Sequence, residues 1–173
     1  AVETFLSLDA NDYTDGTALQ ALRALGAGLR GVKANAGDLE ARLRCMMGAW
    51  LSMVGIVSGT RLGASHAIGH ILGGSAGVPH GHTSCVMLPY VLDWNLAVNG
   101  ERQREVAAAM GEPGKAASEV LDRFIGGLGM PRNLRAVKVA ENDLPRLAQN
   151  CMLDDWTYSN PRKISSPDEV MEI

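Results

Sequence analysis

Aromatic residues are scarce in this 173-residue chain, where they make up 5% of the sequence and include only two phenylalanines. The strands of β-sandwiches and barrels are rich in aromatic and β-branched side chains, so this composition argues against an all-β fold. Alanine, leucine, glycine and methionine are common instead. Small and unbranched side chains favour closely packed helices, and we expect one all-α domain of about eight helices.

The sequence also lacks an excess of charge of either sign and any long apolar run. Its net charge is −3, with acidic and basic residues interspersed, so we expect no nucleic-acid partner. No apolar run is long enough for a membrane span, and the first residues have no basic leader, so we expect no membrane association and a cytoplasmic location. The three cysteines, Cys45, Cys85 and Cys151, are widely spaced without a CxxC pattern, which indicates reduced core thiols.

Apolar residues recur at helical spacing along most of the chain. We expect helices at residues 1–8, 17–32, 39–60, 64–72, 84–97, 101–110, 116–128 and 143–153, and a last helix that opens at Ser166. The helix at 39–60 is apolar almost all round, which predicts burial in the middle of a bundle. The first helix lacks a capping residue and the last is very short, so we expect both ends to be trimmed from a longer domain.

Histidine is rare and confined to one window. All four histidines lie between residues 63 and 95, namely His66, His70, His80 and His82. His66 and His70 are four residues apart and share a helix face, while a glycine-rich turn and a proline can bring His80 back towards that face. Imidazole is a common metal ligand near neutral pH, although such a pair can also be two hydrogen-bonded core histidines. Only one cysteine lies nearby, so an open metal site completed by residues outside the chain fits better than a closed structural zinc site.

The same window closely resembles the signature of the iron-containing (group III) alcohol dehydrogenases. The matching pattern is H-x3-H-x-L-G-x5-P-H-G from His66 to Gly81, followed by L-P-x-V-x3-N from Leu88 to Asn95. Residues 1–7 resemble the family segment that follows its first metal-binding motif, and Asn160-Pro161-Arg162 resembles a turn near the family's C-terminus. The resemblance therefore extends over nearly the whole chain.

This resemblance implies a fold and a set of site residues. Residues 1–173 would form the C-terminal helical, metal-binding domain of the dehydroquinate synthase-like fold, without the N-terminal α/β domain that binds most of NAD(P). In the family an aspartate and three histidines hold a divalent metal, Fe²⁺ or Zn²⁺. The resemblance places two of these ligands at His66 and His80, and the other two in a D-x3-H motif that would precede Ala1. It gives His70 a catalytic and cofactor-binding role facing the nicotinamide.

The implied function is hydride transfer between NAD(P) and a small alcohol, aldehyde or keto-acid by a homo-oligomeric enzyme, with this chain inactive alone. Maleylacetate reductase is an alternative within the fold, since Leu72-Gly73-Gly74 is similar to that branch while Pro79-His80-Gly81 is closer to the alcohol dehydrogenases. A non-catalytic metal-binding or interaction domain is a second alternative, and it would need a complete ligand set within the chain. We expect His82 to point away from the site and not to be a ligand. Trp50, Trp94 and Trp156 are expected in the core, Asn95 to satisfy backbone groups, and Asn160-Pro161-Arg162 to form a structural turn.

Overall fold

The computed structural model describes residues 1–173 as an assembly of helices without β-strands. The α-helices are α1 (Val2–Leu6), α2 (Asp12–Ala34), α3 (Leu39–Val57), α4 (Ala64–Ala76), α5 (His80–Ala109), α6 (Ala117–Leu128), α7 (Leu144–Cys151), α8 (Asp155–Tyr158) and α9 (Pro167–Met171). Two short 3₁₀ helices, η1 (Leu134–Val137) and η2 (Glu141–Asp143), connect α6 to α7. The prediction of an all-α domain is confirmed. None of the helices combines the length and apolar character that a bilayer span requires.

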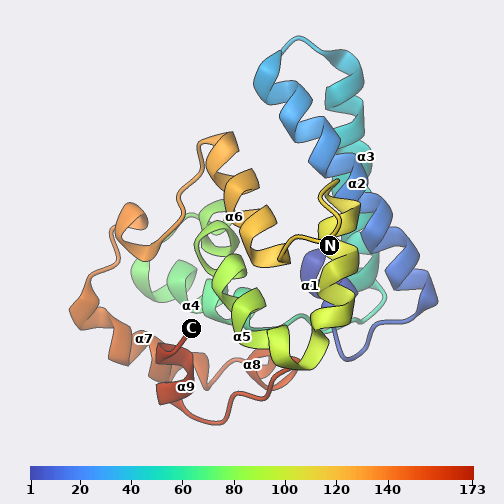
Figure 1. Ribbon diagram of the computed structural model, residues 1–173. Coiled ribbons are helices and arrows are strands. Elements are labelled where there is room, and N and C mark those ends of the chain that lie inside the picture. Colours follow the sequence, from blue (N-terminus) through green and yellow to red (C-terminus); the bar gives the residue numbers. More distant parts are fainter.

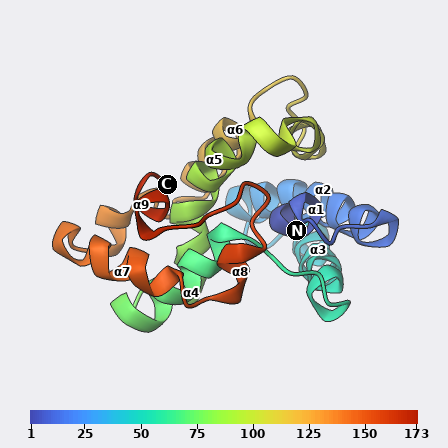
Figure 2. The same ribbon diagram turned by 90° about the horizontal axis from the view of Figure 1, so that it is seen from below.

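Two hydrophobic cores share the long helix α5. One core lies where α4, α5, α7 and α9 meet, and the other lies among α1, α2, α5 and α6. The adjacent residues Val91 and Leu92 belong to different cores, so two different faces of α5 are buried. Seen from below, α4, α7 and α9 lie on one side of the molecule and the α2–α3 hairpin on the other (Figure 2). Figure 1 shows this hairpin extending from the body as an arm.

Several predicted boundaries are wrong because local capping and turns decide where helices begin and end. α2 begins at Asp12 and not at residue 17, since the Asn11 side chain accepts from the backbone N–H groups of Tyr13 and Thr14. α4 continues through Gly73 and Gly74 and ends at Gly77, which takes the left-handed conformation with φ 67°. The predicted helices at 84–97 and 101–110 are confirmed as two helical segments on either side of a kink at Asn99, although the first segment begins earlier, at His80; α5 denotes both segments.

The prediction that the third helix is buried on all sides is wrong. Only Ala41, Gly48 and Gly55 of α3 are buried, and these small residues let α2 and α1 approach closely. A Cβ atom on Gly48 would lie 2.7 Å from Cγ of Leu25 in α2. The opposite face carries large apolar side chains that are exposed, among them Trp50 at 70%, which was expected in the core. Trp94, in contrast, is buried as predicted.

A buried pair of asparagines ties the C-terminal segment to α4 and α5. Asn160 Oδ1 accepts from the backbone N–H of Ala64 at 3.1 Å and from Nδ2 of Asn95 at 3.1 Å. Asn160 Nδ2 donates to Asn95 Oδ1 at 2.8 Å and to the carbonyl of Arg162 at 2.6 Å. The structural roles predicted for Asn95 and for the turn at Asn160 are confirmed, since these amides satisfy each other and the backbone around them.

We predict that Asn160→Ala lowers the free energy of unfolding by about 3 kcal/mol, because it leaves several buried polar groups without partners. Urea denaturation followed by circular dichroism measures this change. The matched control is Asn142→Ala, which removes an exposed asparagine of η2 and should change stability by less than about 0.5 kcal/mol. Equal free energies of unfolding for the two variants would contradict a large contribution of the asparagine pair to stability.

Candidate functional site

The N-terminus of α4 is capped by residues distant in sequence. Its N-cap residue, Gly63, has no side chain, and the carboxylate of Glu3 in α1 takes the capping role. Glu3 is buried, and it accepts from the backbone N–H groups of Ser65 at 2.9 Å and His66 at 3.1 Å. A negative charge is favourable at this end of a helix. A Cβ atom on Gly63 would lie 2.8 Å from Asn160 Oδ1 and 3.0 Å from Glu3 Oε1, so the approach requires glycine.

The same carboxylate fixes the ring of His66. The Nδ1 atom of His66 lies 2.5 Å from Oε2 of Glu3. An ionised carboxylate can only accept hydrogen bonds, so Nδ1 of His66 is the donor, and in the neutral ring the lone pair is on Nε2. The side chain is 29% exposed, so this nitrogen can be reached from outside. A carboxylate behind a histidine is the usual support for a metal-ligating imidazole.

His70 has an equivalent partner from the other end of the chain. Its Nδ1 lies 2.7 Å from Oδ2 of Asp154, and the other oxygen of Asp154 accepts the backbone N–H of Trp156 and caps α8. His66 and His70 are one turn apart on α4 and therefore share a face. Each histidine on this face thus has a carboxylate on Nδ1.

Trp156 packs against both histidines. Its ring centroid lies 6.0 Å from that of His66 in an edge-to-face arrangement and 5.0 Å from that of His70. The expectation that Trp156 belongs to the core is therefore wrong, since it is half-buried beside the site. Sequence reasoning missed Glu3, Asp154 and Trp156 because they lie far along the chain from the histidine motif, and no local pattern marks them.

His80 is the first residue of α5 and is exposed. Thr83, one turn later, donates its hydroxyl to the carbonyl of His80 at 2.9 Å and packs on Gly69 of α4, where an added Cβ would lie 3.0 Å from Oγ1. This contact brings the start of α5 against α4 beside the histidine face. That His66 and His80 share one ion stays a prediction. His82 is half-buried in the first turn of α5.

The chain does not contain a complete set of metal ligands. No group of three or more histidine, cysteine, aspartate or glutamate side chains lies close enough together to hold an ion. The thiol of Cys151 is a poor ligand, because burial, with a smaller contribution from the charge of Asp154, raises its pKa to about 12. Burial likewise raises the pKa of Cys85. A metal site that includes His66 and His80 would therefore need further ligands, and this assignment stays a prediction.

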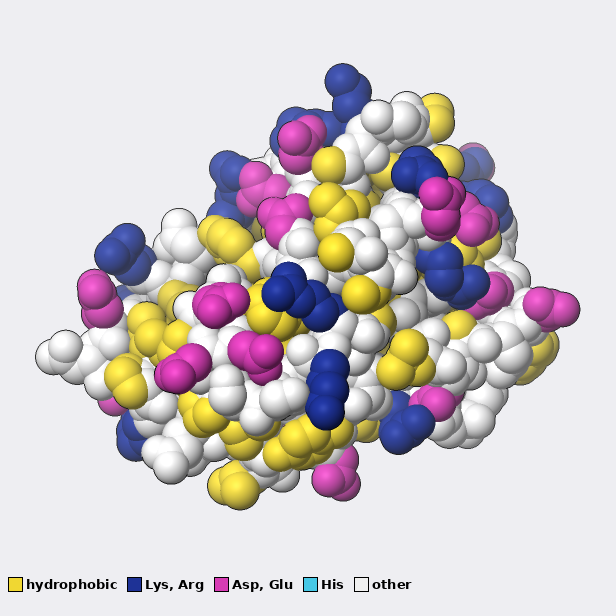
Figure 3. Space-filling view, turned by 60° about the horizontal axis from the view of Figure 1, so that its bottom comes forward, with side chains coloured by type: hydrophobic (Ala, Val, Ile, Leu, Met, Phe, Trp, Pro, Cys, Tyr) yellow, Lys and Arg dark blue, Asp and Glu magenta, His cyan; other side chains and the backbone are white.

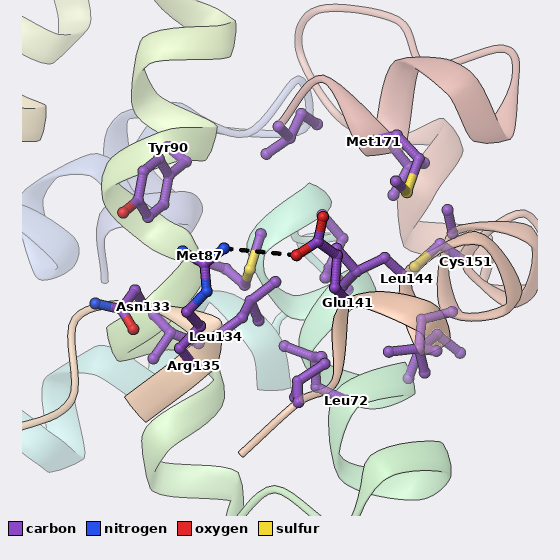
Figure 4. Close-up of a pocket in the computed structure, with 18 residues that line it drawn as sticks. Leu72, Met87, Tyr90, Asn133, Leu134, Arg135, Glu141, Leu144, Cys151 and Met171 are labelled. Carbon is purple, nitrogen blue, oxygen red and sulfur yellow. Dashed lines mark ion pairs between the residues drawn. The ribbon is translucent and has the colours of Figure 1, made fainter. Parts of the chain in front are cut away.

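An apolar cavity of about 380 Å³ lies behind α4, away from the histidine face. Ile68, Ile71 and Leu72 of α4 form one wall, and residues of α5, α7, α9 and the segment 133–141 form the others. Arg135 and Glu141 of that segment form an exposed ion pair at 3.6 Å (Figure 4). Its lining is almost entirely hydrophobic and belongs to one of the two cores, so it offers little catalytic chemistry. The surface in Figure 3 carries interspersed acidic and basic side chains and no histidine.

The sequence profile of the C-terminal part of the Fe-containing alcohol dehydrogenase family matches residues 1–173. This chain belongs to that family. It is 35% identical to the 1,3-propanediol dehydrogenase of Citrobacter freundii, over 100% of the chain and 46% of that relative. It is 34% identical to maleylacetate reductase 1 of Rhodococcus opacus, over 95% of the chain and 45% of that relative.

The solved structures agree with this assignment. A crystal structure of 1,3-propanediol oxidoreductase superposes with a TM-score of 0.89 at 34% identity and covers 99% of this chain and 47% of that one. The chain thus spans about half the length of the curated relatives it matches. The resemblance expected from the histidine motif, and the fold it implied, are both confirmed.

We predict that Glu3→Ala changes the tautomer of His66. Loss of the carboxylate removes the acceptor on Nδ1, so the proton should move to Nε2, the position that an unrestrained imidazole prefers. Long-range ¹H–¹⁵N spectra of the histidine rings above pH 8 distinguish the two forms. Glu105→Ala, at an exposed position of α5, serves as the control and should leave the His66 signals in place. Unchanged His66 nitrogen shifts in Glu3→Ala would show that the carboxylate does not set the tautomer.

Proposed function

We propose that this chain is the helical half of a metal-dependent oxidoreductase that transfers a hydride between NAD(P) and an alcohol or carbonyl compound. The observation that carries the proposal is the histidine face of α4. His66 presents Nε2 with Glu3 behind it, and His70 and Trp156 lie beside it. NAD(P) would be bound mainly by a nucleotide-binding domain outside these residues.

His66 and His80 would hold a divalent metal, Fe²⁺ or Zn²⁺, together with ligands from outside this chain. Neutral imidazoles bind a cation without cancelling its charge, and the hydrogen bond from His66 Nδ1 to Glu3 keeps Nε2 free for this purpose. When bound, such an ion polarises an alcohol or carbonyl oxygen and stabilises the charge that develops there. The chain's own contribution is to orient the donor nitrogens.

His70 would act on the cofactor and substrate side. Its Nδ1 donates to Asp154, so Nε2 is the atom that can accept or return a proton, and Asp154 would stabilise the ring when it is charged. The indole of Trp156 packs against the His70 ring in a tilted arrangement, with the ring centroids 5.0 Å apart. This role distinguishes His70 from the two proposed ligands, although it shares a helix face with one of them.

The substrate could belong to either of two branches. Relatives named 1,3-propanediol dehydrogenase and maleylacetate reductase match the chain at nearly equal identity, 35% and 34%. We favour an alcohol or aldehyde because of Pro79-His80-Gly81, and maleylacetate, a keto-acid, is the alternative. Comparison of the activity of the complete enzyme on short alcohols and on maleylacetate distinguishes them. The resemblance also leads us to propose a homo-oligomer.

We predict that the three histidines separate into two classes in the complete enzyme. His66→Ala and His80→Ala should lose bound metal and activity together, because each removes a direct bond to the ion. His70→Ala should keep nearly all of the metal but lower kcat by about 10²–10⁴-fold, as loss of a general acid–base group does. Metal analysis of purified protein, beside kcat, measures both properties.

The matched control is His82→Ala, which removes the remaining histidine of the chain, just outside the motif, and should retain both metal and activity. If His70→Ala loses metal as completely as His80→Ala, the pair on α4 is the ligand set and the assignment of His80 is wrong.

We also predict that the 173-residue chain alone binds Zn²⁺ or Fe²⁺ weakly and has no dehydrogenase activity, because it supplies only part of the ligand set. Calorimetric titration with Zn²⁺ tests this. Tight, stoichiometric binding that is abolished by His66→Ala would contradict the prediction and would support a self-contained metal-binding domain.

A further inference from the structure

The apolar cavity behind α4 has no role in the proposed function. Its volume is about 380 Å³, and 15 of its 18 lining residues are hydrophobic. The three polar residues come from one segment of the chain and are Asn133, Arg135 and Glu141. Small-molecule sites in proteins are usually apolar hollows of roughly 300–1,000 Å³ in which a few polar groups fix the orientation of the ligand. The cavity therefore has the size and the composition of a ligand-binding site.

The cavity has an apolar inner wall and a polar mouth. Leu72, Val86 and Cys151 are at most 2% exposed, so they belong to the inner wall. The side chains of Arg135 and Glu141, in contrast, are 89% and 82% exposed. Figure 4 shows Arg135 and Asn133 on one side of the cavity and Cys151 on the other. A ligand would thus place an apolar tail inside and a polar head group at the mouth.

The ion pair at the mouth favours a neutral head group. Arg135 and Glu141 are 3.6 Å apart, which is longer than a direct hydrogen bond, so both keep unused hydrogen-bonding capacity. A guanidinium only donates hydrogen bonds, and a carboxylate only accepts them. A hydroxyl group does both, so it can accept from Arg135 and donate to Glu141. A carboxylate in the same place is repelled by Glu141, and an ammonium group is repelled by Arg135.

The inner wall determines the apolar part of the ligand. It is largely aliphatic, and the one aromatic lining residue, Tyr90, is 45% exposed. Aromatic rings preferentially pair with other rings, so an aliphatic wall fits a saturated chain. An engineered apolar cavity of about 150 Å³ holds benzene, which has six carbons. At the same density a cavity of about 380 Å³ holds roughly fifteen non-hydrogen atoms, enough for an alkyl chain of about eight to twelve carbons with its head group.

We propose that this cavity binds a neutral amphiphile with one saturated alkyl chain of about eight to twelve carbons and a hydroxyl head group. The chain packs between α4, α5 and α7, and the hydroxyl bridges Arg135 and Glu141. The site is separate from the histidine face, because the α4 residues that line it lie about half a turn round the helix from His66 and His70. Binding in the cavity therefore requires neither a metal nor NAD(P).

The test is isothermal titration calorimetry of the 173-residue chain with 1-octanol, octanoate and octylammonium near neutral pH. 1-Octanol should bind at a single site with a Kd of about 10⁻⁴ M, as expected for a ligand of its size. Each charged analogue should bind about 10-fold more weakly, because one member of the ion pair repels it. Glu141→Gln leaves Arg135 without a neighbouring carboxylate, so octanoate should then bind at least as tightly as 1-octanol.

Variants of the wall locate the bound molecule. Ala148→Phe fills part of the cavity and should weaken 1-octanol binding by about 10-fold or more. Leu144→Trp, at a half-buried lining position, should have the same effect with less strain on the core. His70→Ala changes the opposite face of α4 and is the control that should leave binding unchanged. Circular dichroism of each variant checks that the helices are retained.

Absence of saturable 1-octanol binding up to about 1 mM, ten times the expected Kd, overturns the proposal. Binding that survives both wall variants overturns it too, because the molecule then lies elsewhere. Equal affinities of the three ligands for the wild-type chain would contradict the role of the ion pair. None of these results depends on the metal or on activity, so they are independent of the proposed function.

Discussion

The buried carboxylate of Glu3 joins the first helix of the chain to the helix that carries the histidines. It accepts two backbone N–H groups at the start of α4 and the Nδ1 proton of His66. Burying a carboxylate costs several kcal/mol unless hydrogen bonds satisfy it, so all three donors must stay in place together. The position of α1, the start of α4 and the tautomer of His66 therefore depend on one another. The same arrangement requires glycine at position 63, because a side chain there would displace the carboxylate of Glu3.

A similar arrangement holds the other side of the histidine face. Asp154 caps the short helix α8 with one oxygen and accepts from His70 with the other, while Trp156 packs against both imidazole rings. The backbone caps and the imidazole partners are thus the same carboxylates. Because each carboxylate both caps a helix and accepts from a histidine, formation of the caps also orients the two imidazoles.

The sequence allowed the helical class, most of the helices and the histidine face to be predicted, because these follow from local spacing and capping. It did not allow Glu3 or Asp154 to be identified as partners, since they reach the histidines from 63 and 84 residues away. The interpretation of α3 failed for a different reason. An apolar helix suggested complete burial, but Ala41, Gly48 and Gly55 bury only a narrow seam of small residues. Their seven-residue spacing was visible in the sequence and marks the inner side of the helix.

The helix α5 is shared between the two hydrophobic cores, and this affects how the domain unfolds. Val86 and Val91 of α5 lie in one core, while Leu92, and Val106 beyond the kink at Asn99, lie in the other. If α5 unfolds, apolar surface of both cores becomes exposed to water. Each exposure raises the free energy, so the two cores lose stability together. The two cores are therefore expected to unfold in one cooperative transition and not as two separate units.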